Sequence, residues 1–410
     1  MKRINPALCA VCKGYKKLCG LPRCPILDRY LWQIRSLSNI DSGELHAPSP
    51  PAIIVGEYGY PYVRVYYSTA PGSPDPRLHD DPLTWIRNKY PLDYIVGLRS
   101  QLVSGIIKAK VGKPEELYSR EISLAAVSVK PVDTDLVLEK KPSPTIRFDG
   151  ITKPVGPASP ARAVVIEGNP RVPRVIEKLY YDELSARKSL WTLYESGIDV
   201  YTAVKAFTLG MMGSRMERRL VPTRWGITAV DSTIGDILHR RVRTFKTVNE
   251  IEVYHEEYLG NSYTIILAPG SYEAEWIEIW YPNTLWTRGT SKPTIVKVVE
   301  QRNGKQSVMD GGYLAARFSV LEHLYRRRRQ AVVLIIREVF PSYYAPVGNW
   351  QIRESVRTAL VNPPVNKPLS TRELIQTLSK LVRYDVNLLV RQSTILKRML
   401  YQARLDSWMK

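Results

Sequence analysis

Residues 250–281 read EIEVYHEEYLGNSYTIILAPGSYEAEWIEIWY, and no other segment predicts as much about the fold. Apolar and aromatic side chains alternate with polar ones here over three short runs, which is typical of β-strands. Gly260-Asn261 and Pro269-Gly270 separate the runs, and both pairs favour tight turns. The segment therefore predicts three strands, at 250–258, 263–267 and 272–281.

Helical periodicity predominates in the segments before and after these strands. Apolar side chains recur every three or four residues in 174–209, with a break near Gly197, and again in 313–325. We also predict helices at 92–107 and 332–340, although the second of these apolar runs also fits a buried strand. Together the strands and helices predict an α+β fold with mixed antiparallel sheets.

The length of 410 residues predicts more than one domain. Prolines gather in 132–173, where persistent apolar residues indicate an ordered connection and not a disordered linker. Ser370-Thr371-Arg372-Glu373 has the form of a helix-capping box, and leucines at helical spacing follow it. The predicted parts are an N-terminal zinc knuckle at 1–30, an α/β body at 31–245, a β-rich body at 246–368 and a helical tail at 369–410.

All four cysteines lie within the first 24 residues. Clustered thiols favour a tetrahedral zinc site, since a two-residue gap in the first pair lets both sulfurs face one metal. Two disulfides, or four inert thiols, are the alternatives. No histidine joins the cluster, which argues against a catalytic metal. We therefore predict a structural Zn²⁺ held by Cys9, Cys12, Cys19 and Cys24.

The chain is strongly basic, with 59 Lys and Arg against 39 Asp and Glu and a net charge of +20. This excess favours a polyanionic partner, most simply nucleic acid, while a generally basic surface is the alternative. No apolar run approaches the roughly 18 residues that span a membrane. The polar N-terminus does not resemble a signal peptide. We therefore expect a cytoplasmic, nucleoid-associated protein that has no membrane segment.

The segment 210–225 places two glycines ahead of four arginines. Glycines allow close backbone approach to a ligand, and arginine forks bind phosphates in bidentate pairs. The alternative is an arginine-rich helix that pairs with acidic neighbours. The candidate phosphate-binding residues are Arg215, Arg218, Arg219, Arg224, Arg353 and Asp231, the last as a partner for an arginine or a metal.

Two further basic runs are His239-Arg240-Arg241-Val242-Arg243 and Tyr325-Arg326-Arg327-Arg328-Arg329-Gln330. Each neutralised phosphate adds salt-dependent affinity, and nearby aromatic rings can stack on bases. A single arginine run is more often a solvated helix face, so neither run is decisive alone. The five histidines form no paired metal motif, and no nucleophile elbow or dinucleotide fingerprint is present. The sequence therefore leaves open whether the protein is an enzyme.

The C-terminus reads Gln402-x-x-Leu405-x-x-Trp408-Met409. This pattern resembles the peptide box that docks on the replication sliding clamp, PCNA, where the glutamine enters a polar pocket and the apolar residues form a plug. Met409 departs from the pattern, because a second aromatic residue is usual there. The alternative is the end of an amphipathic helix with a chance match.

Several motifs together resemble the archaeal Nre family of DNA repair proteins. Besides the cysteines, they are Gly59-Tyr60-Pro61, Arg219-Leu220-Val221-Pro222-Thr223-Arg224-Trp225, Asp310-Gly311-Gly312-Tyr313 and Pro346-Val347-Gly348-Asn349-Trp350. The resemblance implies a role in DNA damage repair, a four-cysteine zinc finger and clamp binding through Gln402, Leu405 and Trp408. Two other functions stay open: an enzyme for nucleotides or nucleic-acid phosphoesters that uses 210–231, and an RNA-binding or ribosome-associated protein.

Overall fold

The computed structural model describes residues 12, 14–18, 24–38, 40, 43–50, 52–144, 156–284, 286–287 and 290–401. The chain divides into two compact units, which are treated separately below. Unit 1 comprises Met1–Pro22, Gly235–Tyr344 and Gly348–Lys410, and unit 2 comprises Arg23–Ile234 and Ala345–Val347.

A five-stranded sheet forms the centre of unit 1, with the strand order β11–β10–β13–β9–β8. The three predicted strands are confirmed, and β8 and β9 form an antiparallel hairpin. However, β13 lies between β9 and β10 and runs parallel to β10, so the three predicted strands are not all neighbours. The strands are β8 (Glu252–Tyr258), β9 (Asn261–Ala268), β10 (Glu273–Trp280), β11 (Thr294–Glu300) and β13 (Val332–Val339).

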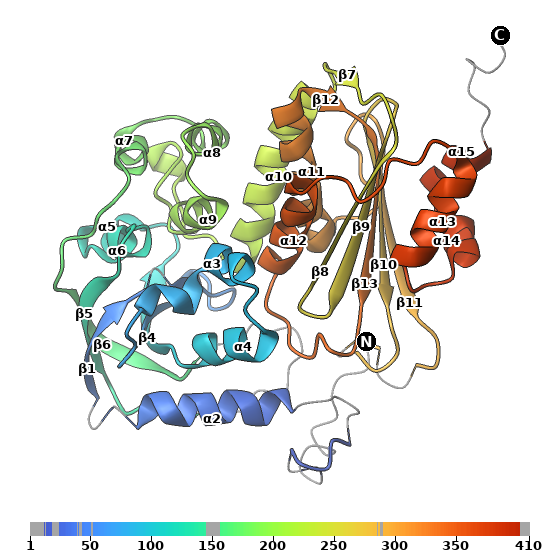
Figure 1. Cartoon of the computed structure of the whole chain (residues 1–410). Helices are drawn as coiled ribbons and strands as arrows, with labels where there is room; N and C mark the ends of the chain where they lie inside the picture. Colours follow the sequence, from blue (N-terminus) through green and yellow to red (C-terminus); the bar gives the residue numbers. More distant parts are fainter. Residues whose placement is uncertain are drawn as a thin grey trace. The chain divides into compact units, whose positions relative to one another are not determined.

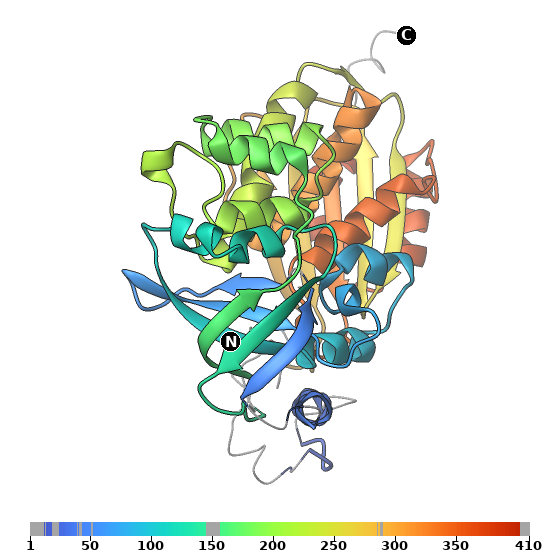
Figure 2. The ribbon, with the colours of Figure 1, turned by 90° about the vertical axis from the view of Figure 1, so that its left-hand side faces the viewer.

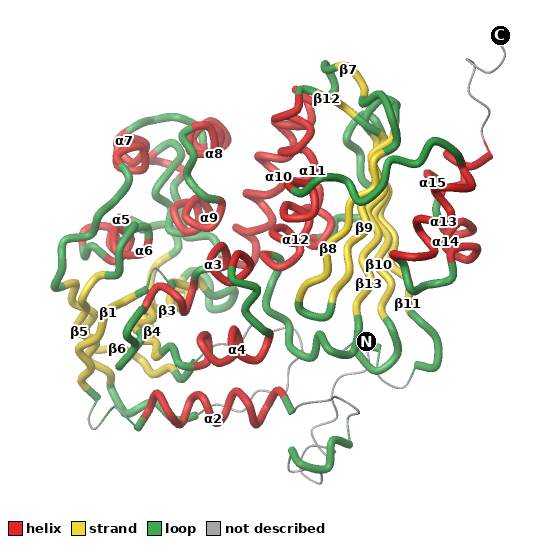
Figure 3. Tube along the Cα trace, in the orientation of Figure 1, coloured by secondary structure: helices red, strands yellow, loops and turns green. Residues whose placement is uncertain are grey.

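Helices cover both faces of this sheet (Figures 1 and 3). On one face lie α11 (Gly311–Arg327), α12 (Trp350–Val361) and the C-terminal half of α10 (Thr223–Val242). The other face carries α13 (Thr371–Leu381), α14 (Val386–Gln392) and α15 (Thr394–Tyr401). For 332–340 the predicted helix is wrong and the alternative, a buried strand, is confirmed, because this run is strand β13. All eight of its residues are buried, so the strand lacks the alternation that distinguishes a half-exposed strand from a helix.

The capping box before α13 is present in the structure. The Ser370 hydroxyl accepts a hydrogen bond from the Glu373 backbone N–H at 3.2 Å. Leucines of the three C-terminal helices then pack on the sheet, where Leu374, Leu378 and Leu389 are fully buried against residues such as Ile336. These helices therefore form part of the core of unit 1.

Unit 2 contains a six-stranded sheet with the order β1–β5–β6–β4–β3–β2. Only β4 and β6 pair in parallel, and the other four pairs are antiparallel. The sheet curls, since the Ser49 hydroxyl donates to the Ser68 carbonyl and the end of β1 thereby meets β3 (Figure 2). The strands are β1 (Glu44–Ser49), β2 (Ile53–Val55), β3 (Tyr62–Thr69), β4 (Val103–Lys110), β5 (Val132–Leu138) and β6 (Ala158–Ile166).

The helix predicted at 92–107 is wrong in its second half. Helix α4 (Leu92–Ser100) ends before β4, which begins at Val103. The apolar run continues across this boundary, so periodicity alone did not reveal the change. Strand β4 needs glycine at position 105, because a β-carbon there would lie 2.4 Å from a methyl carbon of Leu136.

The remaining helices of unit 2 are short. They are α2 (Pro25–Leu37), η1 (Pro76–Asp80), α3 (Pro82–Arg87), α5 (Glu115–Ser119), α6 (Ile122–Ala126), α7 (Arg174–Tyr181), α8 (Ala186–Glu195), α9 (Val200–Thr208) and η2 (Arg215–Glu217). The fold is thus α+β with mixed sheets, as predicted. In the described part of the chain, no helix combines the length and the apolar character that a membrane crossing requires.

Candidate nucleic-acid interface

The two basic runs at the ends of α10 and α11 lie side by side in unit 1. The Arg241 guanidinium donates a hydrogen bond to the Tyr325 hydroxyl at 2.9 Å. Two short parallel strands, β7 (Lys246–Thr247) and β12 (Arg329–Gln330), join the segments that follow the helices. The Gln330 side-chain amide also donates to the Phe245 carbonyl at 2.6 Å. The C-terminal ends of α10 and α11, which are far apart in the sequence, are therefore held together, as are the segments that follow them.

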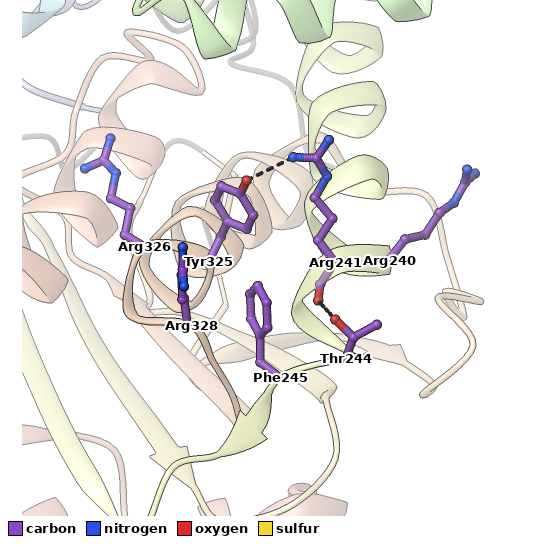
Figure 4. Close-up of a pocket in the computed structure, with 7 residues that line it drawn as sticks. All are labelled: Arg240, Arg241, Thr244, Phe245, Tyr325, Arg326 and Arg328. Carbon is purple, nitrogen blue, oxygen red and sulfur yellow. Dashed lines mark hydrogen bonds between the residues drawn. The ribbon is translucent and has the colours of Figure 1, made fainter.

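An open hollow of about 730 Å³ lies between these segments, and we call it the arginine hollow (Figure 4). The rings of Phe245 and Tyr325 are 6.1 Å apart and inclined by 30°. In Figure 4 these rings lie between the arginines of α10 and those that end α11. The residues that line the hollow are Arg240, Arg241, Thr244, Phe245, Tyr325, Arg326 and Arg328.

Most of the cations at the arginine hollow face solvent. Arg240, Arg326 and Arg328 are exposed. Arg326 is 3.1 Å from the carboxylate of the buried Glu322, and its own side chain stays 64% exposed. Several guanidinium groups around two flat rings can bind phosphate oxygens in bidentate pairs and stack on a base.

Arg328 has an unusual backbone conformation at the end of α11. Its φ of 51° and ψ of 48° place it in the left-handed region, where glycine is the usual residue of a helix end. Its backbone N–H lies 3.1 Å from the Tyr325 carbonyl, which closes the last turn of the helix. This conformation directs the chain from α11 into β12 at the edge of the arginine hollow.

Arg215 and Arg218 lie together in unit 2, next to the end of α7. The Arg218 guanidinium donates to the carbonyls of Gly213 and Asp182, at 2.9 Å and 3.0 Å, and lies over the Tyr180 ring. Arg215 forms an exposed ion pair with Glu183 at 3.2 Å. These contacts tie the loop before α10 to the loop after α7.

The other arginine-segment candidates differ in their exposure and lie on different elements and loops. Arg219 is exposed, and Arg224 lies at the start of α10, where its guanidinium is 3.8 Å from the Glu57 carboxylate. Asp231, in the middle of α10, is buried, as is Arg353 in α12 of unit 1.

The predicted metal and clamp residues lie largely outside the described part of the chain. Cys12 and Cys24 are described, whereas Cys9 and Cys19 are not. The pKa of the Cys12 thiol is lowered, mainly by the backbone N–H of Leu18 and also by those of Gly14 and Lys17. The clamp-motif residues Gln402, Leu405, Trp408 and Met409 also lie outside it.

Two family models match the chain: Archaeal Nre, N-terminal, over residues 18–287, and Archaeal Nre, C-terminal, over residues 298–408. The chain belongs to the archaeal Nre family. It is 36% identical over 359 residues to the DNA repair protein NreA of Archaeoglobus fulgidus, covering 87% of this chain and 89% of that relative.

Two further relatives share similar lengths of chain. The Nre protein is 31% identical over 394 residues to the DNA repair protein NreB of Archaeoglobus fulgidus, with 95% of this chain and 97% of the relative covered. It is 34% identical over 349 residues to the DNA repair protein NreA of Haloferax volcanii, with 82% of each covered. No solved structure matches the chain.

Sequence reasoning about this Nre protein identified each basic run but not their pairing. Phe245 and Thr244 were missed, because they follow the first run in a segment without a helical or strand pattern. A hint was available, since each run ends a helix and helix ends favour cations. Which two helix ends meet depends on packing between distant segments.

Two histidines near the arginine hollow are neutral at pH 7. Burial, reinforced by the charge of Arg327, lowers the pKa of His323 to about 4. Burial, reinforced by Arg317 and Arg243, lowers the pKa of His239 to about 4 as well. The Arg327 guanidinium lies 3.3 Å from His323 Nε2, where a neutral ring can accept its hydrogen bond. The positive charge of the arginine hollow therefore comes from arginines.

These two histidines predict a pH dependence of stability. Between pH 6.5 and about 4, the unfolded chain binds a proton at each histidine while the folded protein does not. The free energy of unfolding should therefore fall as the pH falls, by about 1.4 kcal/mol per pH unit for each histidine. Urea titrations at several pH values measure this loss, and His323→Gln should make it smaller.

His46 provides the control for this measurement. Its hydrogen bond to Asp135 raises its pKa, so it does not contribute to a loss of stability in acid. His46→Gln should therefore not lessen the loss. An acid loss that is unchanged in His323→Gln would mean that His323 is already protonated in the folded protein.

Proposed function

We propose that this Nre protein is a DNA repair protein that binds DNA through the arginine hollow. The observation that carries the proposal is the convergence of two distant arginine runs around Phe245 and Tyr325. The net charge of +20 supports a polyanionic partner. The relatives that cover most of the chain are named DNA repair proteins, which favours DNA as that partner.

The arrangement suits a nucleic-acid backbone better than an internal ion-pair network. In an internal network, carboxylates would neutralise the guanidinium groups, as the buried Glu300 does for Arg317 at 2.7 Å. In the arginine hollow, three of the lining arginines are exposed, and although Arg326 pairs with Glu322 beneath it, no carboxylate is among the lining residues. An open surface with several cations can bind successive phosphates and displace their counterions.

Removal of three exposed charges should weaken DNA binding in a salt-dependent way. We expect the triple variant Arg240→Gln, Arg326→Gln and Arg328→Gln to bind a DNA duplex more weakly than the wild type. The slope of log affinity against log salt should become shallower by roughly 0.9 for each lost phosphate contact. Fluorescence anisotropy with a labelled duplex at several salt concentrations measures both quantities.

Arg372→Gln is the matched control for the triple variant. Arg372 is also an exposed arginine of unit 1, but it lies on α13, against the opposite face of the sheet. The control should keep the wild-type affinity and slope. A control that loses about a third of the affinity and slope that the triple variant loses, on the logarithmic scale, would mean that net charge alone drives binding. An unchanged triple variant would reject the arginine hollow as the DNA site.

We also propose that Cys9, Cys12, Cys19 and Cys24 hold a structural Zn²⁺. Backbone N–H groups lower the pKa of the Cys12 thiol, and a thiolate is the form that binds zinc. The donor set of four thiols fits this metal and supplies no open position for catalysis. The bound metal would cross-link the N-terminal segment. Loss of the metal would therefore lower the stability of the protein.

Metal analysis tests the zinc assignment. We expect about one Zn²⁺ per chain in the purified protein. Cys12→Ser should lower the zinc content and the melting temperature together, because metal binding contributes to folding. Ser36→Ala, at a buried hydroxyl on α2, controls for an unrelated loss of stability and should retain the metal. Protein without zinc but with wild-type stability would reject the assignment.

We further propose that residues 402–410 recruit the protein to the sliding clamp. The motif follows Tyr401, the last residue of α15, which is 78% exposed. A short peptide that follows an exposed helix end can enter a groove on a partner.

Calorimetry with the sliding clamp of the same organism tests this recruitment. We expect micromolar binding that is lost when the chain is truncated after Tyr401. Trp408→Ala should weaken binding strongly because the aromatic residue fills the apolar pocket, whereas Met409→Ala should have a smaller effect. Binding that survives truncation would place the clamp contact elsewhere.

A further inference from the structure

A second surface, in unit 2, gathers exposed aromatic and basic side chains from three distant segments. We call it the aromatic platform. Four large aromatic side chains are exposed there, and they are Tyr58 at 85%, Tyr60 at 50%, Tyr62 at 44% and Trp225 at 54%. Large apolar side chains that gather on a surface are expected at binding sites. The basic residues of the platform are Arg64, Lys108, Lys110 and Arg224, all of them exposed.

Hydrogen bonds from backbone N–H groups hold the three segments of the platform together. The Val55 backbone N–H donates to the Thr223 hydroxyl at 2.8 Å, which joins β2 to the start of α10. The Val111 N–H donates to the Pro61 carbonyl at 2.9 Å, and the Val111 carbonyl accepts from Leu220 at 2.9 Å. The segments 55–62, 108–111 and 219–225 are therefore adjacent, although none of them follows another directly in the sequence.

The cations of the platform lie close to its aromatic rings. In the antiparallel register of β3 and β4, Tyr62 pairs with Lys110, and Arg64 pairs with Lys108. The Lys108 ammonium group lies 5.1 Å from the centre of the Tyr62 ring. At the start of α10, Arg224 precedes Trp225, is 70% exposed at its side chain and lies 3.8 Å from the Glu57 carboxylate, which offsets part of its charge. Positive charge and flat ring faces thus share one surface.

We propose that the aromatic platform binds single-stranded DNA by stacking unpaired bases on its rings. Bases have free faces only when they leave the duplex, and aromatic side chains bind those faces with little dependence on sequence. The adjacent lysines and arginines match the negative backbone that connects the bases. A docking protein would also cover apolar rings, but this excess of cations favours a polyanion.

This inference rests on the proposed function and names the form of DNA that the protein recognises. The arginine hollow binds phosphates, which duplex and single-stranded DNA both carry. The aromatic platform adds a preference for unpaired bases, which damaged DNA and its repair intermediates expose. The two surfaces therefore make separate predictions about the same binding reaction.

The experiment measures binding by fluorescence anisotropy to three probes of equal length, of about 20 nucleotides. The probes are oligothymidine, a DNA duplex, and an abasic strand with the same phosphates and no bases. We expect the double variant Tyr58→Ala and Trp225→Ala to lose on the order of tenfold in affinity for oligothymidine for each stacked base that is lost. Its affinity for the duplex and for the abasic strand should stay within about threefold of wild type.

Tyr401→Ala is the matched control, because Tyr401 is 78% exposed on α15 and belongs to unit 1. It should bind all three probes like the wild type. A second pair, Arg64→Gln and Lys108→Gln, tests the platform without removal of a ring and should weaken oligothymidine binding with a shallower salt dependence.

Three outcomes would overturn the inference. If the wild-type protein binds the abasic strand and oligothymidine equally tightly, then the bases contribute nothing to binding. Aromatic variants that lose duplex and single-strand affinity equally do not act by stacking. In a parallel measurement with oligouridine of the same length, tighter binding of oligouridine than of oligothymidine would point to RNA.

The failure of the inference and that of the proposed function can be told apart. If the arginine-hollow variants weaken DNA binding and the platform variants do not, only the inference fails. If the wild type binds no DNA probe, both fail.

Discussion

One buried ion pair fixes the position of α11 and, with it, the arginine hollow. Glu300, at the end of β11, is fully buried and accepts hydrogen bonds from the Arg317 Nε and Nη2 atoms at 2.7 Å and 2.8 Å. Arg317 also donates to Asp236 of α10 at 3.0 Å. A buried charge without its partner costs roughly 3–5 kcal/mol, so this arrangement specifies one packing of β11, α10 and α11. Arg317 and Asp236 mark the point where α11 and α10 cross. From this crossing both helices run to their C-terminal ends, where the basic runs meet.

The crossing also explains why Gly235 is required in α10. A β-carbon at this position would lie 2.7 Å from the Arg317 Nη1 atom, and hydrogen bonds to Glu300 and Asp236 hold that guanidinium in place. Glycine within a helix costs up to about 1 kcal/mol relative to alanine. Here the close approach of α10 and α11 offsets that cost. The same close approach brings the C-terminal ends of these two helices together.

The sequence predicted the strands in which polar and apolar residues alternate. It did not predict the elements and contacts that depend on pairing between segments far apart in the chain. Strands β8 and β10 were recognisable because polar and apolar residues alternate along them. Strand β13 was recognised only as an alternative to a helix, since helices cover both of its faces and its residues do not alternate. Strand β1 was missed as well, because Pro48 and the neighbouring turn residues favour a bend, and only its pairing with β5 makes it a strand. For the candidate site, the sequence identified the charges but not the contact between Arg241 and Tyr325.

Arg328 has one further consequence. A left-handed backbone costs a non-glycine residue roughly 1–2 kcal/mol, and glycine would adopt the same conformation without that cost. Stability alone therefore favours glycine at this helix end, whereas an arginine here adds a cation to the rim of the hollow. If the arginine hollow binds DNA as proposed, the residue represents a compromise between folding and binding, and a thermostability screen that selects glycine at this position would also select against DNA binding.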